Sequence, residues 1–247
     1  MFRNRPGLPD DWATVVAGNV GSWALLDAGE RETVAADADW LLRHKHWEAA
    51  HGFALTDEMR ATVAVLAAIP VIGLTVEAYR EVSAVVVFPT TIQSQGERAG
   101  PVEGTVSDDV VPVLGEAHGR RGPVLLAWDQ VLDDARHPGQ GRNVVFHEFA
   151  HKLDLLDHVV DGTPPLAGRR DLDRWIAVCT EVYDAMRAGA DRPPLDPYGA
   201  TNPGEFFAVA TEAFLDVPRA LVRHEPDLYA VLQDYFRQDP ATRGRVT

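Results

Sequence analysis

The chain has 247 residues, of which 46% are hydrophobic and 24% charged, as expected for a globular protein of one sizeable or two small domains. Its formal net charge of −14 argues against nucleic-acid binding, because phosphate recognition requires clustered lysine and arginine. The single Cys179 cannot form an internal disulfide, and residues 1–12 lack the apolar segment of a signal peptide. The longest apolar stretch, residues 61–74, is interrupted by Pro70 and is too short to cross a bilayer. We therefore expect a cytoplasmic protein without a membrane partner.

The first third of the chain is expected to be mainly helical. Residues 1–35 are an N-terminal arm without a clear assignment, and one domain is expected over residues 36–247. Residues 30–53 have the apolar spacing of an amphipathic helix. A second helix is predicted to begin after Thr56, an N-cap residue followed by two acidic residues, and to end near Pro70.

The rest of the chain changes from strand patterns to helical ones. Strands are predicted from β-branched and apolar runs at residues 82–89, 110–119 and 122–131. Asn143 is the expected N-cap of a helix that runs through His151 towards Asp157. Further helices are predicted at residues 169–189, 205–215 and 226–238. This order predicts an α+β fold, in which a small mixed sheet packs on the helix of His151 between helical N- and C-terminal parts.

The sequence HEFAH, from His147 to His151, has the spacing of a metal-binding catalytic motif. Residues four apart lie on one face of a helix, so both imidazoles can point at one metal ion. A catalytic zinc site needs three protein ligands and an open position for water. The metal lowers the pKa of that water towards about 7, and Glu148 is placed to take its proton. The motif therefore predicts a zinc site with Glu148 as general base.

A third metal ligand must come from elsewhere, and the spacing leaves alternatives. Asp157 follows His151 by six residues, but on an unbroken helix it faces away from the site. Asp154 is on the correct face but one turn further along, where it either orients an imidazole or is solvated. Glu205 and Glu212 share a face of a later helix, about 10 Å apart along its axis, so at most one of them binds. Periodicity does not choose between these two glutamates.

A family resemblance does choose. The segments NVVFHEFAHKLD, DGTPPL, DPYGATNPGEFFAVATEAFLDVP and LYAVLQDYFRQDP, with GFALTDEMRATVAVLAAIPVI, VVVFP and GPVLLAWDQV upstream, resemble the Mlc titration factor A family of zinc metallopeptidases over about residues 40–240. The resemblance implies a zincin-like fold related to the anthrax lethal factor protease domain. It also implies that Glu205, seven residues after Tyr198, is the third zinc ligand of a gluzincin site, and that Tyr198 stabilises the oxyanion. Enterobacterial members also bind the glucose repressor Mlc.

The sequence thus predicts a zinc-dependent peptidase that acts on a peptide or protein and that also binds a transcriptional repressor of the Mlc type. The alternative is a non-catalytic protein that sequesters a regulator and whose metal site is structural. Glu148 discriminates between them, because a structural site needs ligands but has no use for a general base.

Overall fold

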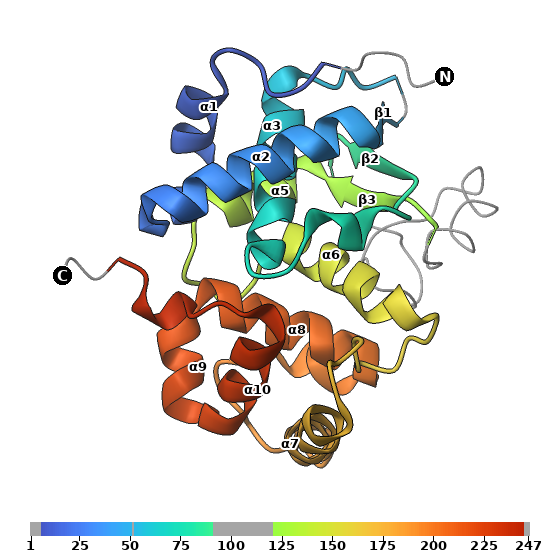
Figure 1. Cartoon of the computed structure of the whole chain (residues 1–247), viewed down its shortest axis with the longest axis vertical. Helices are drawn as coiled ribbons and strands as arrows, with labels where there is room; N and C mark the ends of the chain where they lie inside the picture. Colours follow the sequence, from blue (N-terminus) through green and yellow to red (C-terminus); the bar gives the residue numbers. More distant parts are fainter. Residues whose placement is uncertain (1–5, 51, 91–120, 245–247) are drawn as a thin grey trace.

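A computed structural model describes residues 6–50, 52–90 and 121–244 of the chain. It has the expected α+β composition, with many helices and one small sheet (Figure 1). The elements before the centre of the chain are α1 (Trp12–Asn19), η1 (Gly21–Leu25), α2 (Ala28–His44), β1 (His46–Ala49), α3 (Asp57–Ala68), η2 (Ile69–Val71), η3 (Val76–Tyr79), β2 (Ala84–Phe88), β3 (Val124–Ala127) and α5 (Trp128–Arg136). Those that follow are α6 (Val144–Asp154), η4 (Leu155–Asp157), α7 (Arg169–Arg187), η5 (Pro197–Ala200), α8 (Pro203–Asp216), α9 (Pro218–His224), α10 (Pro226–Phe236) and η6 (Pro240–Thr242).

The sheet has the strand order β1-β2-β3, and its two pairings are both parallel. Trp47 lies opposite Val85, and Val86 lies opposite Leu125. This corrects the expected mixed sheet for the part of the chain that the structure describes. The parallel pairing of β1 with β2 follows from the crossover through α3, since parallel neighbours need a long connection. The strand predicted at residues 110–119 lies outside the described residues.

Two predicted elements have different boundaries in the structure. The helix expected over residues 30–53 ends at His44, and His46–Ala49 is strand β1 instead. Lys45 makes this change of direction, because its backbone is extended and its buried ammonium group donates to the carbonyl of Tyr79. The strand expected over residues 122–131 ends at Ala127, where α5 begins.

The core runs through the whole described chain. Val16 of α1, Val34 of α2 and Val85 of β2 belong to the same buried cluster as the aromatic residues of α8 and α10. Figure 1 shows α6 between an N-terminal layer of α2, α3 and the sheet and the C-terminal helices α7 to α10. On one side α6 contacts α3 and β3, and on the other side it contacts α8. Among the described residues, no helix is both long and apolar enough to span a membrane.

Candidate metal centre

Helix α6 begins at the predicted N-cap. The side chain of Asn143 accepts hydrogen bonds from the backbone N–H groups of Val145 and Phe146, both at 3.1 Å. These bonds satisfy two of the donors that every helix start leaves unpaired. One side of the helix is apolar and buried in the core, through Val145, Phe146, Phe149, Ala150 and Leu153. Burial of that side turns the histidines towards α8.

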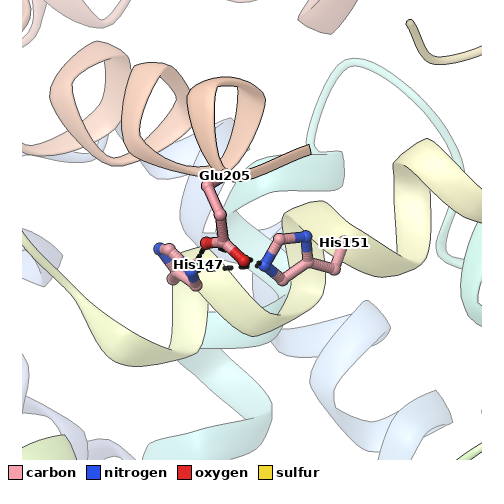
Figure 2. Close-up of side chains that lie close together, drawn as sticks. All are labelled: His147, His151 and Glu205. Carbon is pink, nitrogen blue, oxygen red and sulfur yellow. Dashed lines mark hydrogen bonds and ion pairs between the residues drawn. The ribbon is translucent and has the colours of Figure 1, made fainter. Parts of the chain in front are cut away.

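Helix α8 delivers the carboxylate. The side chain of Asn202 caps the helix by accepting from the backbone N–H of Glu205 at 3.0 Å, and Pro203 occupies the first turn, where its missing N–H costs nothing. Glu205 is therefore held in the first turn of a helix that packs directly on α6. Its side chain is buried and points between the two histidines, as Figure 2 shows.

The three predicted ligands converge. Glu205 Oε2 lies 3.0 Å from His147 Nε2 and 3.5 Å from His151 Nε2, and the two Nε2 atoms are 3.2 Å apart (Figure 2). One donor atom from each side chain lies within 4.8 Å of the others, and this is the one group of three in the described residues that can hold a metal ion. Two imidazoles and one carboxylate are a donor set that zinc accepts.

Protonation of His147 is coupled to the nearby carboxylates. Burial acts to lower the pKa of His147, but hydrogen bonds to Glu205 and Glu212 outweigh it and raise the pKa to about 10. Burial likewise acts to raise the pKa of Glu205, but its bonds to His147 and His151 hold it at about 2. Without a metal, both ring nitrogens of His147 are therefore protonated at neutral pH, and the cationic ring forms a buried ion pair with Glu205.

Zinc must displace that proton to bind His147, which gives a prediction. Because the pKa of His147 lies above neutrality, binding should release a proton at pH 7, and zinc affinity should rise with pH up to about 10. Isothermal titration of the metal-free protein with zinc, in two buffers of different ionisation enthalpy, counts the protons released. Equal binding heats in both buffers would show that no proton leaves.

The carboxyl group of Glu148 is buried beside the two histidines, and its pKa is raised. Burial raises the pKa of its carboxyl above the ordinary value, although His151, His147 and Lys152 oppose the shift. Its Oε1 atom is buried and has no hydrogen-bond partner in the described part of the chain. A buried carboxylate oxygen without a partner is costly unless a ligand or water satisfies it. This atom therefore fits a site in which a water molecule is held beside the three ligands.

Tyr198 lies at the edge of the same site. It belongs to η5, and its backbone N–H donates to the side chain of Asp196 at 2.8 Å. Its ring is 6.2 Å from that of His147 between centroids, and the side chain is 38% exposed. The ring of Tyr198 is thus near that of His147 and exposed to solvent.

The two aspartates of α6 and η4 do not join the group. Asp157 is exposed and outside the group, as expected, but the predicted helix does not reach it: α6 ends at Asp154, and Asp157 lies in η4. Asp154 is neither the imidazole partner nor the solvated acid considered from the sequence. It is fully buried and accepts from the N–H of Gly162 at 3.0 Å, and burial raises its pKa to about 6. Gly162 has a φ of 73° and lies so close to the carbonyl of Pro203 that a Cβ would clash.

Glu212 has a role that the sequence did not reveal. It approaches His147 from the side opposite to Glu205, with Oε2 3.1 Å from Nδ1. It is therefore outside the group of three and against the far nitrogen of a predicted ligand. The seven-residue spacing between Glu205 and Glu212 predicts that they share a face of α8. It does not predict which residues of α6 that face contacts.

Two histidines four apart on one helix, a glutamate after the first and a carboxylate from a second helix define the HExxH class of metallopeptidase sites. Comparison with known proteins refines this class. The model of the glucose-regulated metallo-peptidase M90 family matches residues 1–237, and the chain belongs to that family. The match includes residues 1–35, for which the sequence alone offered no assignment.

Relatives of known sequence cover most of the chain. An uncharacterized protein of Synechocystis sp. is 32% identical over 94% of this chain and 86% of its own length. Proteins named Mlc titration factor A are 32% identical in Pectobacterium atrosepticum, over 89% of this chain and 83% of that protein, and 30% identical in Serratia proteamaculans, over 88% and 84%. These matches confirm the family that the sequence motifs indicate.

Proposed function

We propose that this protein is a zinc-dependent peptidase of the gluzincin type with a zincin-like fold. The observation that carries the proposal is the convergence of His147, His151 and Glu205, with donor atoms within 4.8 Å of one another and Glu148 in the same helical turn. His147, His151 and Glu205 would hold one zinc ion and leave its fourth position open. When bound, zinc supplies a Lewis acid that polarises a peptide carbonyl and lowers the pKa of a water molecule.

The protein's own residues carry out the proton transfers. Glu148 takes a proton from the water as its oxygen attacks the peptide carbonyl carbon, and later gives that proton to the leaving amine nitrogen as the C–N bond breaks. The raised pKa of Glu148 favours both steps, the uptake of the proton and its later release. A carboxyl group whose pKa is nearer to physiological pH exchanges its proton more readily. Tyr198 donates a hydrogen bond to the carbonyl oxygen as negative charge develops on it.

Peptide cleavage tests the proposal directly. The purified zinc-loaded protein is incubated with a peptide library derived from a bacterial proteome, and new termini are identified by mass spectrometry. The Glu148→Gln variant serves as the control for contaminating peptidases. We expect cleavages with the wild-type protein that are missing with the variant. Identical cleavage patterns in the two samples would reject the proposed activity.

The phenol of Tyr198 gives a prediction of its own. Tyr198→Phe should leave zinc content and substrate affinity nearly intact, because the side chain is outside the group of three. It should lower kcat by about 10²–10³-fold, since the hydrogen bond forms mainly in the transition state. Steady-state kinetics on one cleaved peptide separate kcat from KM. An unchanged kcat would leave Tyr198 as an ordinary loop residue.

A second candidate function is binding of a transcriptional regulator. It is favoured by the relatives named Mlc titration factor A, which this chain resembles over most of its length. Under this alternative the protein sequesters a repressor of the Mlc type in the cytoplasm, and its metal site is structural. A co-purification with the host's own repressors of this class tests it. Retention of a repressor by both the wild type and Glu148→Gln, with no peptide cleaved by either, would favour binding over catalysis.

A further inference from the structure

The carboxylate of Glu212 connects the start of α6 to one of the predicted zinc ligands. One oxygen, Oε1, accepts from the backbone N–H of Asn143 at 2.7 Å. The other, Oε2, lies 3.1 Å from Nδ1 of His147. Glu212 is only 7% exposed, so water does not compete effectively for either contact. One oxygen of Glu212 therefore holds the start of α6, and the other contacts the ring of His147 directly.

We propose that Glu212 is a positioning residue that fixes the ring orientation and the tautomer of His147. Oε1 of Glu212 already accepts from Asn143, and its Oε2 faces Nδ1 of His147, so we assign the donor role in this second contact to Nδ1. In the neutral ring the lone pair is then on Nε2, the atom that faces Glu205 and His151. A metal binds that lone pair, and an acceptor on the far nitrogen also makes the imidazole a stronger ligand. The inference rests on the proposed metal site.

An amide at position 212 cannot do the same. Glutamine has one accepting oxygen, whereas Asn143 and His147 both present N–H donors when the metal is bound. If the amide oxygen accepts from Asn143, the NH₂ group faces Nδ1 and favours the tautomer with a proton on Nε2, which blocks the metal. If the oxygen accepts from His147, a buried backbone N–H loses its partner. The first arrangement satisfies all groups in the metal-free protein, so the substitution acts against metal binding more than against folding.

The last residue of the same helix offers a matched control. Asp216 accepts from the backbone N–H groups of Gly139 at 2.9 Å and Gly141 at 2.7 Å, in the loop that leads into α6. It thus holds the same segment but has no contact with His147 in the structure. Asp216→Asn also replaces a carboxylate that accepts from several backbone N–H groups by an amide. It should lower the melting temperature of the metal-free protein and leave zinc affinity unchanged.

Zinc affinity, measured by competition with a chromophoric chelator, tests the inference. Glu212→Gln should bind zinc about 10–100-fold more weakly than the wild type, the loss typical for removal of a ligand's hydrogen-bond partner. Its metal-free form should keep native circular dichroism and melt above Asp216→Asn. Equal zinc affinity of Glu212→Gln and wild type would overturn the inference. Failure of the wild type itself to bind zinc would instead reject the proposed function.

A measurement on the unaltered protein covers the case in which Glu212→Gln does not fold. In the zinc-loaded wild type with ¹⁵N-labelled histidine, Nδ1 of His147 should be protonated, and its proton should exchange slowly with solvent because Glu212 shields it. An unprotonated Nδ1, with the metal on that nitrogen, would contradict the assignment.

Discussion

The Glu148→Gln variant should retain one zinc ion per chain and lose most of its peptidase activity. The side chain is outside the group formed by His147, His151 and Glu205, so the amide leaves the metal ligands in place. It cannot accept a proton, however, and proton transfer by a positioned side chain typically contributes about 10²–10⁴-fold to the rate. Zinc analysis combined with kcat/KM on a cleaved peptide checks both parts of this expectation.

The same substitution at an exposed position provides the control. Glu181→Gln on α7 changes the net charge of the protein equally but lies on the solvent side of its helix. It should have wild-type activity. If Glu148→Gln cleaved peptides as fast as Glu181→Gln, Glu148 would not be the base and the proposed chemistry would be wrong.

Glu205→Ala should abolish both zinc binding and activity. Only His147 and His151 remain as ligands in this variant, and a site with two protein ligands does not hold zinc firmly. The loss of affinity should exceed the about 10–100-fold expected when only an outer hydrogen-bond partner of a ligand is removed, as in Glu212→Gln. Zinc stoichiometry after dialysis, measured for both variants side by side, distinguishes the direct ligand from the positioning residue.

The order of the two effects decides the assignment. A Glu205→Ala protein that keeps one zinc ion while Glu212→Gln loses it would exchange the two roles. That result would also remove the basis for placing Tyr198 at the oxyanion, since the same motif supports both residues. Normal circular dichroism of each variant is required, because both glutamates are buried in the packed interface between α6 and α8.

The features that the sequence predicted well are local ones. The caps at Thr56 and Asn143 depend on residues two or three positions away, and both are confirmed. The helical phase that places His147 and His151 together is likewise contained in five residues. The end of α3 before Pro70 follows from the missing N–H of that proline.

The features that were missed depend on residues far apart in the chain. Strand β1 is only four residues long, and its sequence alone reads as a continuation of α2. Its pairing with Ala84–Val87 makes it a strand. The spacing within α8 did not choose between Glu205 and Glu212, and only the family resemblance favoured Glu205; the contact of Glu212 with the far nitrogen of His147 depends on how α8 lies on α6 and was missed. Asp154 is buried because Gly162 folds back onto it. In each case the partner that decides the structure could not be identified from local pattern.

A titration of the metal-free protein with zinc, with peptide cleavage followed at each step, tests the central claim most directly. If His147, His151 and Glu205 hold the one zinc ion that catalysis requires, activity should rise in proportion to bound zinc and reach a plateau at one equivalent. Full cleavage by the metal-free protein, or one equivalent of firmly bound zinc without any cleavage across a proteome-derived library, would contradict it.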